Sequence, residues 1–216
     1  MLASELMTGL RKALHDPDGV RWNDEDLLDL ITRAQRHLVM LRPDASSVVE
    51  RVTLETGSTR QDVPDQGRFI GLVRNVNGDG TPGMAITPVD RNSLDEANLA
   101  WHGEPPSSVV DNYAFEEEVP TVFWVSPAPA AGVRVELEYS RRPPKLESVE
   151  QELIVPDIFS DPLEDYVLYR CWARSNSSPS SWQKGMDALR QMYVSLGEEA
   201  KARLLISPNS GKVNNG

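Results

Sequence analysis

The chain has 216 residues, of which 39% are hydrophobic, and its 33 acidic and 22 basic side chains leave a net charge of −11. This composition excludes a chain that is disordered throughout and leaves room for one large domain or two small ones. A single cysteine, Cys171, excludes an intrachain disulfide, and no apolar run approaches the roughly 20 residues that span a bilayer. The first residues, MLASELMTGLRKALHDPDG, lack the long apolar core of a signal peptide. We therefore expect a soluble protein from a reducing compartment.

The negative charge is concentrated in the middle of the chain. Residues 1–45 carry a net charge of −2, residues 46–155 carry −9, and residues 156–216 carry 0. Proteins that grip nucleic acid neutralise its phosphates with clustered Lys and Arg side chains, and the sequence has no basic stripe of this kind. The charge distribution argues against tight nucleic-acid binding and is compatible with a surface that repels nucleic acid.

Two helices are predicted at the N-terminal end. The first ends at the turn residues HDPDG and has apolar residues at helical spacing, namely Leu6, Met7, Leu10 and Leu14. The second, WNDEDLLDLITRAQRHLVMLRPD, starts at the N-cap residue Asn23, and three carboxylates occupy its first turn. Pro43 ends it.

From Val48 onward the pattern is typical of β-strands. Short β-rich runs separated by polar turns are SVVERVTLE, RFIGLVRNV, GMAITPVDR and VPTVFWVSPAPAAGVRVELEYSRRPP. A short helix capped by Asp90 is expected in DRNSLDEANLAW. In the last run, apolar and charged residues alternate, which predicts one buried and one solvent-facing side. The apolar set is Val133, Val135, Leu137 and Tyr139, and the charged set is Arg134, Glu136 and Glu138.

Helices return near the C-terminus. Pro162 suits the first turn of a helix capped by Ser160 or Asp161, which continues as LEDYVLYRCWARS. This helix is apolar over much of its circumference and should contact neighbours on several sides, so we expect Tyr166 and Trp172 to be largely buried. After the SSPSS break, WQKGMDALRQMYVSLGEEAKARLL predicts a last helix, and ISPNSGKVNNG predicts a flexible tail.

Together these elements predict an α+β fold, in which a helical bundle built from both chain ends carries an inserted antiparallel β domain. The predicted divisions are residues 1–45 for the N-terminal half of the bundle, 46–155 for the β domain, 156–205 for the C-terminal half of the bundle, and 206–216 for the tail.

The stretch RNVNGDGTPG, residues 74–83, is the first candidate for a functional centre. It spaces Asn75, Asn77 and Asp79 two residues apart, as calcium loops space their ligands. Such loops need several carboxylates and a distal bidentate Glu, whereas Asp79 is the only carboxylate of the three and Ile86 stands at the distal position. Asn-Gly and Asp-Gly pairs are strong hairpin signals. We therefore predict a β-turn, with no bound metal or cofactor.

The remaining candidates do not predict a catalytic site. His15, His37 and His102 are not at metal-ligand spacing, Cys171 lies in an apolar helix, and the adjacent Glu116, Glu117 and Glu118 alternate between the sides of a strand. No nucleophile elbow, P-loop or dinucleotide fingerprint is present. Arg170 stands among Tyr and Trp residues. We expect it to pair with a carboxylate within the bundle or across a subunit boundary, because a buried charge needs a partner.

Four segments, taken in order, resemble the head-to-tail adaptor proteins of short-tailed bacteriophages, also described as tail tubular protein A-like connectors. They are WNDEDLLDLITRAQRHLVMLRPDA, GMAITPVDRNSLDEANLAWH, FWVSPAPAAGVRVELEYSRRPPKL and VPDIFSDPLEDYVLYRCWARS, and they cover most of residues 20–175. The resemblance implies a four-helix bundle with an inserted β domain, and it implies no catalytic residues.

The resemblance also implies a place in the virion, at the head-tail junction, after assembly in the host cytoplasm. There the chain would form a ring, typically of twelve copies, around a channel through which genomic DNA passes without specific binding. The implied partners are further copies of the chain, the portal protein and the tail nozzle protein, with tail fibres an open question and no membrane. We expect residues 206–216 to order on the portal, with Ile206 and Val213 as anchors.

Two rival functions compete with the adaptor. One is a free-standing β-type module of the tail that binds fibres or carbohydrate, which would not need the terminal helices. The other is a metal-dependent cell-wall hydrolase, for which the sequence lacks a His/Asp or His/Cys cluster.

Overall fold

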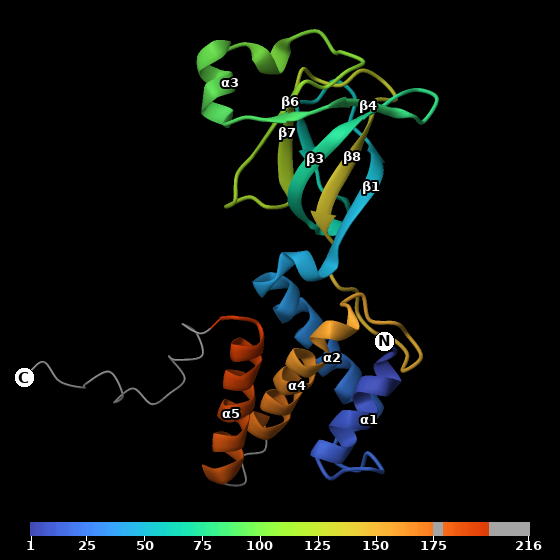
Figure 1. The fold of residues 1–216 in the computed structure, drawn as a ribbon, viewed down its shortest axis with the longest axis vertical. Helices are drawn as coiled ribbons and strands as arrows, with labels where there is room; N and C mark the ends of the chain where they lie inside the picture. The colour runs from blue at the N-terminus through green and yellow to red at the C-terminus, as the bar shows by residue number, and fades with distance from the viewer. Residues whose placement is uncertain (175–178, 199–216) are drawn as a thin grey trace, which may run out of the picture. The chain divides into compact units, whose positions relative to one another are not determined.

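The computed structural model describes residues 1–174 and 179–198 of the chain. Within these residues the fold is mixed α/β, with five α-helices and two four-stranded sheets (Figure 1). The chain divides into two compact units, residues 1–45 with 143–216 and residues 46–142. The first unit is helical, and the second contains both sheets together with the short helix α3 (Arg91–Ala97).

The helical unit contains α1 (Ala3–Ala13), α2 (Asp24–Leu41), α4 (Ser160–Arg174) and α5 (Pro179–Ser195). The second helix begins as its sequence predicts, because the side-chain oxygen of Asn23 accepts a hydrogen bond of 2.8 Å from the backbone N–H of Asp26. Helix α4 packs on each of the other three helices. Helices from both ends of the sequence therefore share one unit.

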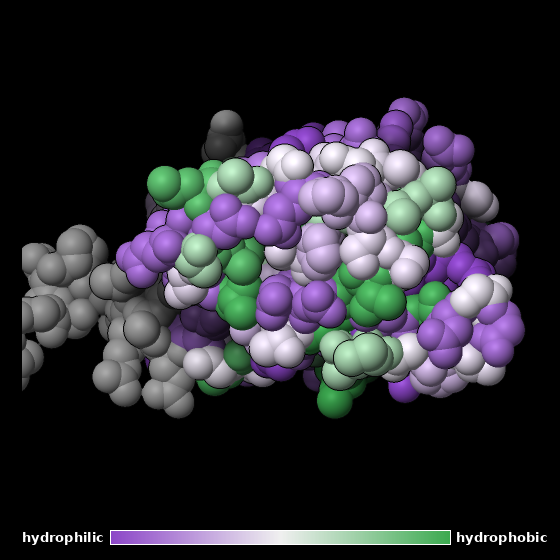
Figure 2. Space-filling model, turned by 90° about the horizontal axis from the view of Figure 1, so that it is seen from above, coloured by the Kyte–Doolittle hydropathy of each residue, from purple (hydrophilic) through white to green (hydrophobic). Residues whose placement is uncertain are grey.

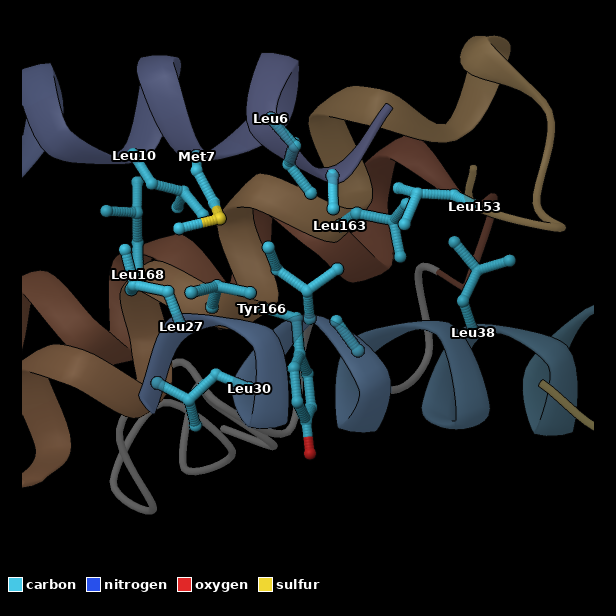
Figure 3. Packing of buried hydrophobic residues seen from close by; sticks show 14 of the residues in the cluster. Leu6, Met7, Leu10, Leu27, Leu30, Leu38, Leu153, Leu163, Tyr166 and Leu168 are labelled. Carbon is cyan, nitrogen blue, oxygen red and sulfur yellow. The ribbon is translucent and has the colours of Figure 1, made fainter. Parts of the chain in front are cut away.

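One hydrophobic core joins these helices. Figure 3 shows side chains of α1, α2 and α4 meeting in its interior, including Leu6 and Leu10, Leu27 and Leu30, and Leu163. Tyr166 is largely buried, as its position in the apolar helix predicts, with 8% of its surface exposed. Trp172 was expected to be equally buried but is only partly so, because it lies at the edge of this core.

The β unit contains two sheets. In the first, the strand order is β1 (Ser47–Thr53), β8 (Arg134–Ser140), β3 (Arg68–Val76), β4 (Pro82–Ala85), and all neighbours are antiparallel. In the second, the order is β2 (Arg60–Asp62), β7 (Val122–Ser126), β6 (Asn112–Phe115), β5 (Thr87–Pro88). Here β5 and β6 are parallel, which corrects the expectation of a wholly antiparallel domain. Parallel neighbours need a long connection, and α3 lies in the one between these two strands.

The core of the β unit is formed by apolar residues of both sheets. Phe69 of β3 stacks on Phe123 of β7 with ring centroids 4.7 Å apart, and it meets Tyr113 of β6 edge-on at 5.6 Å. The alternation predicted for β8 is confirmed for the apolar set, since Val133, Val135, Leu137 and Tyr139 are all buried.

Residues 143–155 belong to the helical unit, whereas the sequence divisions included them in the β domain. Leu146, Leu153 and Val155 are buried in the helical core. The backbone N–H of Leu146 donates to the Thr32 hydroxyl of α2 at 3.0 Å, and that of Ile154 donates to the Gln35 side-chain oxygen at 3.1 Å. This segment thus takes some of its hydrogen bonds from polar residues on α2, and its backbone makes others with Met1, Ala3 and Ser4.

Candidate functional site

The stretch Arg74–Gly83 runs from the end of β3 through a hairpin turn into β4, which confirms the turn predicted for it. The Asp79 carboxylate accepts hydrogen bonds from the backbone N–H and the hydroxyl of Thr81, at 2.9 and 2.6 Å. These two bonds lower the pKa of Asp79, with the hydroxyl contributing most. Gly80 adopts a φ of +85°, which glycine reaches without strain. Asp79 is therefore used to close the turn.

Asn75, the first of the three spaced residues, points away from the other two into the β unit. It is 5% exposed. Its amide nitrogen donates to the carbonyls of Met84 and Val110 at 3.1 and 2.8 Å, and its oxygen accepts from the N–H of Val110 at 2.9 Å. Asn75 thus points away from Asn77 and Asp79, whose side chains both contact the Thr81 hydroxyl, at 3.0 and 2.6 Å. Across the described ranges, 1–174 and 179–198, no group of three or more His, Cys, Asp or Glu residues is placed to hold a metal.

His102, His37 and Cys171, which the sequence singled out, each have local contacts that explain them. His102 shares a hydrogen bond of 2.6 Å between its Nδ1 and the Thr59 hydroxyl. His37 stacks on Tyr166 with ring centroids 4.8 Å apart. Burial raises the pKa of the Cys171 thiol to about 12, so this group stays protonated and packs as a small apolar side chain.

An ionic ladder crosses the outer face of the first sheet. Glu136 of β8 lies opposite Arg51 of β1 and Arg74 of β3, and its carboxylate oxygens are 3.4 and 2.6 Å from the Nε atoms of those two arginines. Arg74 first, and then Arg51, lowers the pKa of Glu136. The alternation in the sequence predicted that Glu136 faces solvent. Its side chain does lie on the outer face, but it is only 8% exposed because two arginines flank it. This ladder, which sequence reasoning missed, fixes the register of three strands.

The surface charge of the β unit is dominated by carboxylates. Residues 46–142 contain eight arginines, no lysine and fifteen acidic residues, a net charge of −7. Seven of the eight arginines are bound within the unit: Arg51 and Arg74 to Glu136, Arg60 to Asp62, Arg91 to Glu116, Arg141 to Glu50, Arg142 to Gln66, and Arg134 to backbone carbonyls. Figure 2 shows a face on which small hydrophobic groups are separated by hydrophilic ones. Most of the basic groups of this unit are therefore already engaged.

A surface groove of about 660 Å³ lies in the helical unit, between the first turns of α2 and the segment around Leu146. We call it the α2 groove. Its apolar floor is made by Leu28 and Leu146, which are 8% and 2% exposed. Charged groups surround the floor, and these are Glu25, Asp26, Asp29, Lys145 and Glu147. The groove therefore has a mainly polar lining of net negative charge over two buried leucines.

The remaining predicted site residues are Arg170, Ile206 and Val213. Arg170 is partly buried, and its guanidinium carbon lies 6.0 Å from the ring centroid of Tyr166, one helical turn earlier. This is a cation–π contact within α4, and the ion pair expected for Arg170, in the bundle or between subunits, stays a prediction. Ile206 and Val213 lie outside the described residues.

Comparison with known proteins identifies the family. No curated protein matches the chain. Within the part of the chain that the structure describes, no helix is long and apolar enough to cross a membrane. Residues 1–210 match the family described as SU10 adaptor protein, which confirms the resemblance to phage head-to-tail adaptors that four segments of the sequence carry. A phage adaptor is a component of the virion, and its partners are other head and tail proteins of the phage. The chain therefore belongs to the SU10 adaptor protein family.

Proposed function

We propose that this chain is a non-catalytic head-to-tail adaptor that forms a ring, of about twelve copies by analogy with similar adaptors, between the portal and the tail nozzle. The observation that carries the proposal is the family match over residues 1–210. In this proposal α1, α2, α4 and α5 form a four-helix bundle, and rings assemble in the host cytoplasm before they join the virion.

Mass measurement on the purified protein, alone and mixed with the portal protein, tests the proposed ring. We expect a closed oligomer, either alone or on the portal. The mass of the portal complex should exceed that of the portal alone by a fixed number of copies of the chain. A monomer that ignores the portal and binds fibre protein or carbohydrate would contradict the adaptor ring and favour a free-standing binding module. The buried core of the helical unit argues against that module, since a β-type binder has no use for it.

We infer that the acidic β unit helps the genome to pass without adhering. The net charge of −7 on residues 46–142 is repeated in every copy, and seven of the unit's eight arginines are already bound within it. Free carboxylates repel phosphates, and engaged arginines are less available to neutralise them. Electron microscopy of the portal complex tests this inference. A channel lined continuously by Lys and Arg would contradict it.

We further propose that residues 206–216 order on the portal, with Ile206 and Val213 as apolar anchors. Ordering costs roughly 1–2 kcal/mol of backbone entropy per residue, so each tail adds little affinity and the ring gains chiefly from many copies. The test is deletion after Leu205. Rings that join the portal with unchanged affinity after this deletion would show that the tail has no such role.

A further inference from the structure

Strand β1 leaves one side of the first sheet open along its whole length. It pairs with β8 over Ser47–Thr53 without a register shift, and no strand in the described part of the chain pairs with its other side. Figure 1 shows β1 along the margin of the β unit. An unpaired side of this kind is a template for an added strand. We call it the β1 edge.

The other edge strands of the unit carry the protections that proteins use against pairing, namely short length, proline and bulges. Strand β4 has four residues, begins with a proline and has a register shift against β3. Strands β2 and β5 have three and two residues, and β5 contains a proline. Strand β1 has seven residues and none of these features, and Arg51 is the one charged residue on its outer face.

The backbone groups of alternate β1 residues point toward this open side. Just outside the two ends of the strand, Ser46 accepts a hydrogen bond from the residue after β8, and Leu54 donates one to the residue before β8, at 3.0 Å each. Bonded residues alternate along an antiparallel pair, so the even-numbered residues of β1 bond to β8 and the odd-numbered ones face the open side. Apart from the β1–β8 ladder, no described residue forms a backbone hydrogen bond with Val49, Arg51 or Thr53.

The side chains of the β1 edge specify the charge of a fitting strand. The ladder of Arg74, Glu136 and Arg51 alternates in sign across three strands and ends at the open side on a cation. The Arg51 side chain is 52% exposed in spite of its bond to Glu136, and Val49 is 56% exposed. A carboxylate opposite Arg51 would continue the alternation, and an apolar side chain would pack on Val49. The edge therefore fits an extended segment that is both acidic and apolar.

The segments of a second copy that could pair here lack this chemistry. The outward residues of β1 include no carboxylate, so no register of β1 on the β1 of a second copy places one opposite Arg51. Strands β4 and β5 contain none, and the Asp62 carboxylate of β2 is bonded to Arg60 at 2.7 Å. Residues 199–216 contain one acidic side chain and three basic ones. Charge complementarity thus points to a different protein.

We propose that the β1 edge takes up an extended acidic segment of the tail nozzle protein by strand addition. The backbone groups of Val49, Arg51 and Thr53 bond to this segment, and one of its carboxylates lies opposite Arg51. The partners of the adaptor family are other head and tail proteins. Because the proposed function assigns residues 206–216 to the portal, the β unit is left for the nozzle. The inference rests on that function and deepens it by naming one contact.

Hydrogen exchange resolved to single residues tests the contact on the full chain alone, on the chain bound to portal protein, and on the same complex with nozzle protein added. The amides of Val49, Arg51 and Thr53 should exchange rapidly in the first two samples and about tenfold or more slowly once the nozzle protein binds. The amides of Glu50 and Val52, which face β8, are the internal control and should exchange slowly throughout.

Each other exchange pattern overturns the inference. Protection of the three outward amides in the chain alone would mean that a second copy or the chain's own tail fills the edge. Protection that appears with portal protein would assign the edge to the portal. A nozzle complex, verified by its mass, that leaves these amides unprotected would remove the contact and leave the adaptor function standing. A portal-bound chain that binds no nozzle protein would contradict the adaptor function as well.

Substitutions on the β1 edge give a second test, measured as nozzle binding to the portal-bound chain. Val49→Pro removes an outward N–H and no bond to β8, at an edge position where proline is tolerated. It should weaken binding about tenfold, whereas Val49→Thr, which keeps the N–H, should stay within about threefold of the wild type. Unchanged binding by folded Val49→Pro would overturn the inference.

The charge opposite the nozzle segment is tested separately, which also decides the matter if Val49→Pro does not fold. Arg51→Gln should weaken nozzle binding about threefold at low salt and reduce its dependence on salt. Arg60→Gln, an equally exposed arginine on the β2 edge, is the matched control and should change neither. Equal effects of the two variants would overturn the inference.

Discussion

Asp165 on α4 is a carboxylate whose ionisation works against the folded helical unit. Burial first, and then the charges of Glu164 and Asp161, raises the pKa of Asp165 from 3.8 to about 6. A group with a raised pKa binds its proton more tightly in the folded chain than in the unfolded chain. The resulting stability is fully present below the unfolded pKa and is lost as the pH rises from about 4 to about 6.

The magnitude follows from the size of the pKa shift. A shift of about two units corresponds to nearly 3 kcal/mol at 1.36 kcal/mol per unit. Asp165 is partly exposed, so solvent screens part of that energy, and we expect about half of it to be measurable. Asp165→Asn should therefore raise the free energy of unfolding by about 1–2 kcal/mol at pH 7.5 and by much less at pH 4.5.

Urea unfolding at pH 4.5, 6 and 7.5, followed by tryptophan fluorescence, measures this effect. Asp18→Asn is the matched control, because Asp18 is an exposed carboxylate of the helical unit and is not among the charges that raise the pKa of Asp165. The control should leave stability nearly unchanged at all three pH values. If Asp165→Asn raises the free energy of unfolding equally at pH 4.5 and 7.5, or does not raise it at pH 7.5, the ionised Asp165 carboxylate does not destabilise the folded unit.

Three further substitutions test the packing of the two units. Asn75→Ala should cost about 2–3 kcal/mol in urea unfolding, since two carbonyls and one N–H in the β unit lose their partner; near-wild-type stability would mean that water replaces the amide. Arg74→Ala should lower the melting temperature more than Arg68→Ala on the same strand, and the difference between the two variants should shrink as acid protonates Glu136. Equal falls in melting temperature at neutral pH would show that the ladder does not contribute to stability. Gly185→Ala should raise stability by up to about 1 kcal/mol, because alanine is the better helix former and its Cβ would lie no closer than 3.4 Å to α4. A loss of stability would show that α4 and α5 cannot adjust to hold the added methyl group.

The sequence could predict elements whose signals are local. Asn23 capped a helix because its side chain, and the acidic first turn after it, act within a few residues of chain. The alternation in β8 identified its buried residues because a strand next to a core repeats every two positions. The run GMAITPVDR predicted a single strand, whereas the structure divides it between β4 and β5. The parallel pairing of β5 with β6 escaped prediction because its two paired residues, Thr87 and Pro88, carry no periodic pattern of their own.

Features that join distant segments could not be found in this way. Glu136 is buried because β1 and β3 supply Arg51 and Arg74 on either side, and those strands are far from β8 in sequence. The α2 groove combines Leu28 with Leu146, which become neighbours only when the 143–155 segment runs along α2. Strand pairing and groove lining are properties of the assembled unit, so no window of sequence contains them.

The buried polar groups of this chain are used to hold the chain itself in place. Asp16, 8% exposed, accepts hydrogen bonds from the backbone N–H groups of Val20, Arg21 and Trp22 at 2.8–3.1 Å, and so shapes the loop between α1 and α2. Asn75 holds β3 to Val110 in a similar way, and Glu136 holds three strands. A catalytic constellation instead aims perturbed groups at a shared cleft. Polar residues that set loop shape and strand register suit the adaptor family to which the chain belongs, and they would give the proposed ring rigid surfaces for assembly.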